Sequence, residues 1–465
     1  MRRIPFTQGA AAALSGISGT PSLQLKGQVA GISGLAVEVC GLSHYLTVGD
    51  RVGLCGRAGR EIAAEIVGFR GGVARAMTYG ASEGLGPGSA VYFKPPAPGA
   101  PRSAGLFVSD AWIGRVIDPL GRPLDRRGPL PHGPRLMPVR ASPPEATLRA
   151  RLGERLDLGV RVLNAFTTCR RGQRLGLFAA SGVGKSTLLA MLARHTACDV
   201  AVLALVGERG REVREFLEDD LGAAGLQHAV VVVATSDRPP LLRREAAYAA
   251  MTVAEYFRDQ GKNVLLLMDS VTRFCLALRE IGLAAGEPPA TRGFPPSVFA
   301  ELPRLLERAG PGQEVAGRPT GHITALFTVL VEGDDHDEPV ADAVRGILDG
   351  HVILDRHIGE GGRYPAVDVL RSLSRTVPGC NNDAENAVAR RARKILALHA
   401  DMADLVRLGA YKAGSDPAVD EALEVMPRLE DVLRQGRDEK TSLADSFAMV
   451  KAALDGTAPP PKAPS

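Results

Sequence analysis

Residues 176–190 are "GLFAASGVGKSTLLA", a stretch in which a strand-like run is followed by a glycine-containing turn and a helix-like run. It nearly matches the pattern G-x-x-x-x-G-K-[ST], a turn between a strand and a helix that holds phosphates with backbone N–H groups. The apolar run "RLGLFAA" predicts a buried strand before the turn, and "KSTLLAMLARH" predicts a helix after it. Because strand, turn and helix are in register, the sequence favours a nucleotide-binding loop over an accidental glycine-rich turn.

The loop departs from the pattern at its start. Ala179 stands where the pattern has its first glycine, at a strand end that tolerates a methyl group. Ala180 is less favourable, because its side chain excludes the positive φ that glycine can adopt. Lys185 can neutralise the β and γ phosphates, and Ser186 can ligate magnesium. The other loop residues expected to bind the nucleotide are Ser181, Gly182, Val183, Gly184 and Thr187.

Further apolar runs predict a parallel sheet across residues 105–377. They include "VAVLALVG", "AVVVVAT", "NVLLLMDS" and "HITALFTVLVEG". Continuous apolar runs, rather than alternating ones, are typical of strands that are buried on both faces. Helical stretches lie between them, so an α/β core is expected.

The segments on either side of this core have a different character. Residues 23–94 contain short β-branched runs separated by turn signals, which predict a small antiparallel barrel. A proline-rich linker follows at 94–103. Helical periodicity over 378–455 predicts a helical domain, and 456–465 is expected to be a disordered tail. Residues 1–22 are expected to be a flexible segment.

Composition limits the function classes. The 465 residues include 56 Lys and Arg against 52 Asp and Glu, a net charge of +4 that gives no basis for a nucleic-acid binder. The six cysteines form no CxxC pair and no metal-type cluster, which favours reduced thiols in a cytosol. No apolar run approaches the roughly 18 residues of a membrane span, and the first residues lack a signal peptide's apolar run. A soluble protein is expected.

Two charged positions follow predicted strands of the core. Asp269 ends one buried run, where a carboxylate can hold magnesium through its waters. Glu208, followed by Arg209, ends another and could orient the attacking water. A plain strand terminus and a solvated charged turn are the competing interpretations. We favour catalytic roles because the carboxyl ends of parallel strands meet at one crevice.

The stretch "GGRYPAVDVLRSLSR" supplies three further candidates. Tyr364 offers a ring on which adenine could stack, and Arg371 and Arg375 offer positive charge. From spacing alone, an exposed tyrosine and two surface arginines would be the default interpretation.

The acidic loop "EGDDHDEP" at 332–339 could suggest a metal site around His336. A solvated or partner-contacting loop is favoured, because no second ligand cluster accompanies it. His322 and Trp112 are interpreted as structural residues.

Six blocks of the chain together resemble the flagellum-specific export ATPases of FliI type. This family belongs with type III secretion ATPases and the catalytic subunits of rotary ATP synthases, and the resemblance runs from about residue 23 to 440. It implies an N-terminal β-barrel, a RecA-like ATPase core and a C-terminal helical domain. The blocks are "GVGKSTLL", "LVGERGREVREFLEDDLG", "LMDSVTRF", "GEPPATRGFPPSVFAELPRLLERAG", "FTVLVEGDDHDEPVADAVRGILDGHVILDR" and "YPAVDVLRSLSR".

The resemblance also implies roles for individual residues. Lys185 and Ser186 would be the phosphate-loop pair, Glu208 the catalytic glutamate and Asp269 the magnesium aspartate. Tyr364 would stack on adenine, and Arg375 would be an arginine finger given to a neighbouring subunit. The loop around Asp334 and Asp335 would face a central stalk. The chain departs from the family pattern at Ala180, His322 and Phe294.

The resemblance implies that a homohexameric ring hydrolyses ATP with Mg²⁺ as cofactor, and that this hydrolysis drives flagellar protein export. The implied partners are a stator-like regulator, a coiled-coil stalk protein, a membrane export gate, and export substrates with their chaperones. The implied location is the cytoplasmic side of the inner membrane, with no nucleic-acid partner.

Four alternatives stay open. An injectisome ATPase uses nearly the same core. A rotary synthase subunit is less well matched, because the stretches "GERGREVREFLEDDLG" and "EGDDHDEP" fit export relatives better. A nucleic-acid translocase such as Rho would need a basic barrel rich in aromatic residues, which 23–94 lacks. A non-catalytic ring subunit would lack the lysine and the glutamate.

Overall fold

The computed structural model describes residues 24–56, 59–96, 104–180, 182–314, 317, 319–331 and 338–458. Contacts group the chain into two compact units, which divide between Ser103 and Ala104, with Ala284–Glu287 joining the first unit. The flexible segment predicted at 1–22, the linker beyond Pro96 and the tail beyond Ala458 lie outside the described residues. The exact domain boundaries stay predictions.

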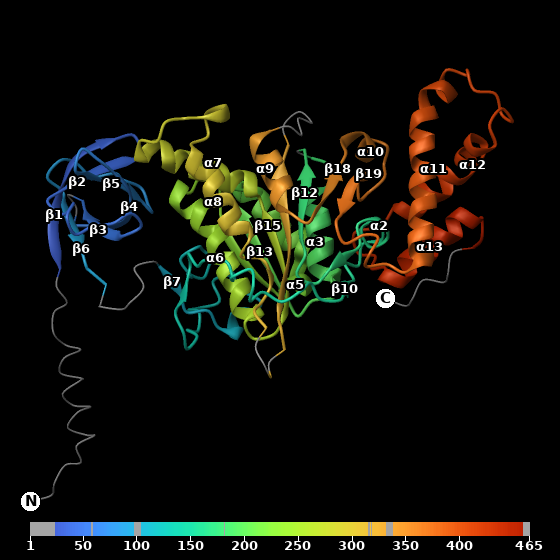
Figure 1. Ribbon diagram of the computed structural model, residues 1–465. Coiled ribbons are helices and arrows are strands. Elements are labelled where there is room, and N and C mark those ends of the chain that lie inside the picture. The colour runs from blue at the N-terminus through green and yellow to red at the C-terminus, as the bar shows by residue number, and fades with distance from the viewer. Residues whose placement is uncertain are drawn as a thin grey trace, which may run out of the picture. The chain divides into compact units, whose positions relative to one another are not determined.

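The first unit is a closed antiparallel barrel with the strand order β1-β2-β5-β4-β3-β6 (Figure 1). Alternate side chains along its strands point inward, such as Val52 and Leu54 on β3, and form one apolar core. The antiparallel barrel predicted from the short β-branched runs is confirmed. Its strands are β1 (Leu25–Ser33), β2 (Ala36–Cys40), β3 (Arg51–Cys55), β4 (Glu61–Arg70), β5 (Val73–Thr78) and β6 (Ala90–Phe93).

The second unit contains a mostly parallel sheet with the order β19-β18-β12-β17-β15-β13-β14-β8. Only the β18–β19 and β16–β17 pairings of this sheet are antiparallel. The predicted α/β core is confirmed. The strands are β8 (Val116–Ile117), β12 (Arg174–Ala179), β13 (Val200–Val206), β14 (Ala229–Ala234), β15 (Asn263–Asp269), β16 (Gly310–Pro311), β17 (His322–Leu330), β18 (Gly350–Leu354) and β19 (Val367–Ser374).

The continuous apolar runs are explained by packing on both faces of this sheet. Along β13, alternate residues enter two different apolar cores, with Leu203 on one face and Val202 on the other. Helices cover both faces (Figure 1), so no strand face needs polar side chains. The main helices of the core are α2 (Arg161–Phe166), α3 (Lys185–His195), α6 (Pro240–Arg258), α7 (Val271–Ala285), α8 (Pro296–Leu306), α9 (Pro339–Ile347) and α10 (Arg356–Glu360).

Three helices complete the second unit: α11 (Asp383–Arg407), α12 (Pro417–Leu433) and α13 (Leu443–Asp455). α11 begins with a capping box, in which the Asn382 side chain accepts from the Glu385 N–H and Glu385 accepts from the Asn382 N–H. The predicted C-terminal helical region is confirmed. Among the described residues, no helix is both long and apolar enough to cross a membrane.

Candidate active site

The phosphate loop joins β12 to α3 through two left-handed glycines. Gly182 has φ 80° and Gly184 has φ 86°, a conformation that residues with a Cβ adopt only with strain. A Cβ on Gly184 would also lie 3.1 Å from the Tyr364 ring. Ala180 is buried and keeps a negative φ, so its methyl group fits the loop without strain. Ser181 lies outside the described residues.

Parallel strands bring three predicted residues together at the same edge of the sheet. Lys185 begins α3 after β12, Glu208 follows β13, and Asp269 ends β15. The Lys185 Nζ lies 2.5 Å from Asp269 Oδ1 and 3.4 Å from Glu208 Oε1. The Thr328 hydroxyl donates to the same Asp269 oxygen at 2.7 Å, from the neighbouring strand β17. No pattern in the sequence indicated this role for Thr328, because only the pairing of β17 with β15 brings it beside Asp269.

Burial and opposite charge act against each other in this cluster. Burial lowers the pKa of Lys185, but the Asp269 and Glu208 carboxylates outweigh burial, so its pKa is raised and the ammonium stays charged. Burial raises the pKa of Glu208, and the charge of Asp269 adds to this effect while Lys185 opposes it. Glu208 therefore takes up a proton at a higher pH than an ordinary glutamate does. A raised pKa makes the Glu208 carboxylate a stronger base, which suits a group that accepts a proton from water.

The oxygen atoms at this edge fit a magnesium ion. Ser186, Glu208 and Asp269 line one small recess. Mg²⁺ takes hydroxyl and carboxylate oxygens, and beside phosphates it needs only one or two protein ligands. The Lys185 ammonium between two carboxylates shows that the recess accommodates positive charge. No cluster of three or more His, Cys, Asp or Glu suited to a metal occurs in the described part of the chain.

A cavity of about 650 Å³ opens over the loop and the charge cluster. Glycine backbone, Thr187 and Glu208 line it together with three arginines, Arg209, Arg273 and Arg356. The side chain of Arg209 is mostly exposed and pairs with Glu212 at 3.3 Å. Sequence reasoning missed Arg273, although its place four residues after Asp269 in "DSVTRF" puts it in the first turn of α7. Four carboxylates also line the cavity, and Lys185 and the arginines are the groups in it that can pair with the phosphates of a polyphosphate ligand.

A second, mostly apolar cavity of about 370 Å³ adjoins the loop. Gly184 and Thr187 line both cavities, so the two cavities adjoin at the start of α3. The exposed ring of Tyr364 forms one wall, as expected of a surface for a flat base. Sequence reasoning missed the other wall, which comes from the segment between α12 and α13: Gln435, Gly436 and Arg437.

Arg371 lies within the edge strand β19 and Arg375 directly follows its last residue, and the two arginines differ in their environment. Arg371 pairs with Asp355 at 3.6 Å and with Asp368 at 4.0 Å. Arg375 is exposed, and no ion pair of its side chain occurs among the described residues. Its N–H donates to the Asp349 carbonyl, just before β18 begins. Arg375 therefore lies near the amino-terminal end of β12, whereas Lys185 lies beyond its carboxyl end. The six residues of β12 span about 20 Å at roughly 3.3 Å per residue, so Arg375 cannot reach the phosphate loop of its own chain.

The remaining predicted positions fall into two groups. The acidic loop with Asp334, Asp335 and His336 lies outside the described residues. Trp112 is buried, and its indole N–H donates to the Pro131 carbonyl at 2.9 Å, in agreement with a structural role. His322 lies at the start of β17, at the edge of the sheet away from the phosphate loop.

Comparisons with known proteins agree with this geometry. The nucleotide-binding domain of the ATP synthase alpha/beta family matches residues 159–374, and the T3SS EscN ATPase C-terminal domain matches 382–452. The flagellum-specific ATP synthase of Caulobacter vibrioides is 53% identical over 429 residues, 92% of this chain and 95% of that protein. That of Bacillus subtilis is 47% identical over 434 residues, again 92% and 95%.

A solved structure is similar over nearly the same span. The assembled ATPase EscN of the enteropathogenic E. coli type III secretion system is 38% identical and has a TM-score of 0.83. The match covers 92% of this chain and 100% of that one. EscN in complex with its central stalk EscO matches with a TM-score of 0.81 at the same identity and coverage.

Proposed function

This chain belongs to the flagellum-specific ATPases of the ATP synthase alpha/beta family, and from that membership we propose how its residues hydrolyse ATP and what the reaction drives. The enzyme is an ATPase of flagellar protein export. The observation that carries the mechanism is the meeting of Lys185, Glu208 and Asp269 beside the phosphate loop.

Each group of the cluster has one role in hydrolysis. Loop N–H groups and the start of α3 bind the phosphates, and Lys185 neutralises the β and γ phosphates. Glu208 holds the attacking water and accepts its proton. Ser186 and Asp269 would hold Mg²⁺, and Thr328 keeps Asp269 in place. When bound, Mg²⁺ neutralises charge that develops on the phosphate oxygens.

The adenine base occupies the apolar cavity and stacks on Tyr364. Arg209 lies at the rim of the phosphate cavity, where its charge favours the approach of a polyphosphate.

We further propose that the active species is a homohexameric ring. Arg375 is exposed at the edge strand and lies far from its own loop, which suits a finger for the next subunit. A relative of 38% identity has been solved in assembled form and with a central stalk. The loop around Asp334 and Asp335 is proposed to contact such a stalk protein. Export substrates with their chaperones, a stator-like regulator and a membrane export gate complete the proposed partners, on the cytoplasmic side of the inner membrane.

Glu208→Gln is expected to retain ATP binding and to lower kcat by roughly 10²–10⁴-fold, since the amide cannot accept the proton of the water. Nucleotide affinity and steady-state ATP hydrolysis of the purified protein measure the two effects separately. Glu218→Gln is the matched control, because Glu218 is exposed, pairs with Arg214 and lies outside the cavity lining. Hydrolysis at near the parent rate by Glu208→Gln would reject the role of general base.

The raised pKa of Glu208 predicts how activity depends on pH. Below this pKa the carboxyl is protonated and cannot act as a base, so kcat/KM should fall as the pH falls through it. The midpoint is expected above the value of an ordinary glutamate, about 4.3. Profiles of kcat/KM against pH for the parent and for Glu218→Gln should share this acid limb. An acid limb at the ordinary glutamate value would contradict the prediction.

A further inference from the structure

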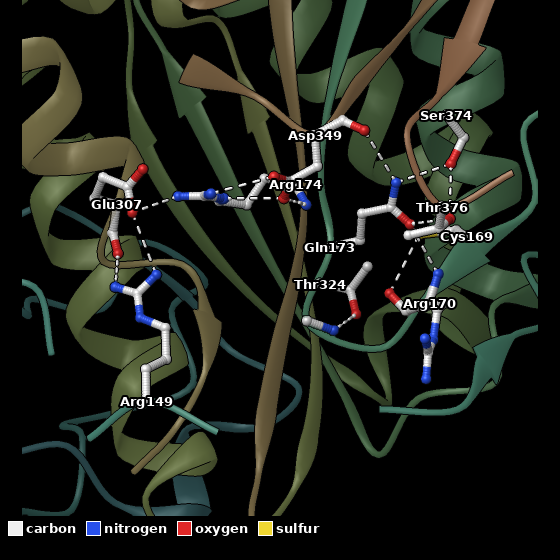
Figure 2. A network of polar contacts seen from close by, with 11 residues as sticks. Arg149, Cys169, Arg170, Gln173, Arg174, Glu307, Thr324, Asp349, Ser374 and Thr376 are labelled. Carbon is white, nitrogen blue, oxygen red and sulfur yellow. Dashed lines mark hydrogen bonds and ion pairs between the residues drawn. The ribbon is translucent and has the colours of Figure 1, made fainter. Parts of the chain in front are cut away.

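The backbone around Arg375 is held by a buried polar network at the amino-terminal end of β12 (Figure 2). Its centre is Gln173, which is fully buried just before that strand. In Figure 2 the Gln173 amide lies between Asp349 on one side and Ser374 and Thr376 on the other. Ser374 and Thr376 are the two chain neighbours of Arg375.

All four hydrogen-bonding positions of the Gln173 amide are used. Its Nε2 donates to the Ser374 hydroxyl at 2.9 Å and to the Asp349 carbonyl at 3.2 Å. Its Oε1 accepts from the Arg170 N–H at 3.0 Å and from the Thr376 hydroxyl at 3.1 Å. A buried amide with every partner in place fixes the positions of those partners, because any movement leaves a buried polar group unpaired.

The neighbours of Arg375 are also tied to one further carbonyl. The Ser374 hydroxyl donates to the Thr168 carbonyl at 2.9 Å, and the Thr376 hydroxyl contacts the same oxygen at 3.2 Å. The N–H of Arg375 itself donates to the Asp349 carbonyl at 2.9 Å. Three consecutive residues are thus fixed to the core, whereas the Arg375 side chain is left to face outward.

Asp349 is itself held in place by charge. Its carboxylate accepts from the Arg174 N–H at 3.0 Å and from Arg174 Nε at 3.1 Å. Arg174 in turn pairs with Glu307 at 2.6 Å, and Arg149 pairs with Glu307 at 3.3 Å (Figure 2). Asp349, whose carbonyl accepts from the Arg375 N–H, is therefore anchored to Arg174 at the start of β12. Arg174 in turn connects it to Glu307, which follows α8.

We propose that Gln173 and Thr376 are positioning residues for Arg375, which they hold at the angle needed to reach the γ-phosphate in the neighbouring subunit. This inference rests on the proposed finger role of Arg375. A finger must be preorganised, because a displacement of about 1 Å in a catalytic group can cost on the order of 10²-fold in rate. The network supplies that rigidity without touching the nucleotide.

Thr376→Val tests the proposal with little risk to folding, since valine has the same shape and removes only the hydroxyl. Its kcat is expected to fall about 10-fold, within the range that misplacement allows, while KM for ATP changes by less than about twofold. Gln173→Met removes the whole amide and should lower kcat further, again with little change in KM for ATP. Thr196→Val is the matched control, because the buried Thr196 hydroxyl has no hydrogen-bond partner in the part of the chain that the structure describes. Thermal unfolding of each variant checks that it is folded.

A double-mutant cycle separates positioning from a general structural effect. If Thr376 acts through Arg375, then adding Thr376→Val to Arg375→Ala should cause no further loss of kcat. An unchanged kcat in folded Thr376→Val, or the same fold loss in the Arg375→Ala background, would overturn the inference. A near-normal Arg375→Ala protein would instead reject the finger role itself, and the inference with it.

Mixing experiments give an independent readout. Thr376→Val should regain activity when mixed with Lys185→Ala, which has an intact finger and no phosphate-loop lysine. It should regain none when mixed with Arg375→Ala, because both proteins lack a working finger. Recovery with Arg375→Ala but not with Lys185→Ala would place the defect of Thr376→Val in the nucleotide site and reject the positioning role.

Discussion

Arg375→Ala is expected to lower kcat by roughly 10³–10⁵-fold, the effect of losing an arginine finger. Lys185, Glu208 and Asp269 converge within one chain, but Lys185 is already engaged with two carboxylates. Arg375 is exposed, follows directly after the edge strand β19, and is flanked by the two hydroxyl residues that bind the Gln173 amide. ATP affinity should change little, because Arg375 acts on the charge that develops during transfer. Single-turnover hydrolysis and nucleotide binding measure the two quantities.

Arg371→Ala is the matched control for this loss. Arg371 lies on β19, four residues before Arg375, but is paired with Asp355 and Asp368, so its removal should leave kcat nearly unchanged. If the finger acts between subunits, specific activity should rise with protein concentration as rings form. Mixed Lys185→Ala and Arg375→Ala proteins should then recover some turnover. Concentration-independent activity together with a near-normal Arg375→Ala protein would reject the ring mechanism.

Lys185→Ala is expected to abolish detectable turnover, a loss of at least about 10³-fold, and to weaken ATP binding. Both effects are expected because Lys185 supplies the positive charge nearest the phosphate loop and is fixed there by Asp269. The free protein should also lose stability, by about 3 kcal/mol, since two buried carboxylates would be left facing each other. Hydrolysis assays, nucleotide titration and chemical unfolding of the nucleotide-free protein check the three expectations.

Lys451→Ala is the matched control for the lysine. Lys451 is exposed on α13 and distant in sequence from the loop, so its removal should leave turnover unchanged and stability within about 0.5 kcal/mol. A Lys185→Ala protein as stable as the parent would contradict the charge balance described for the cluster. Retained hydrolysis would contradict its role toward phosphate.

The layout of the fold and the residues that meet at the central site could be predicted from the sequence alone. Local patterns distinguish a barrel, a parallel α/β core and a helical region, because short strand-like runs between turn signals, continuous apolar runs and 3.6-residue periodicity reflect different kinds of burial. Lys185, Glu208 and Asp269 could be predicted to meet, since each follows a predicted strand and parallel strands share one carboxyl edge.

The more distant segments that complete the site could not be predicted from the sequence. Thr328 reaches Asp269 because β17 pairs beside β15, and the segment from Gln435 enters the base cavity because the C-terminal helices pack against the core. Strand order and helix docking depend on long-range packing, which leaves no local pattern in the chain. The same holds for Gln173: as a single polar residue before a strand it carries no signal. Three of its four hydrogen bonds, those with Asp349, Ser374 and Thr376, form only once β12, β18 and β19 lie side by side.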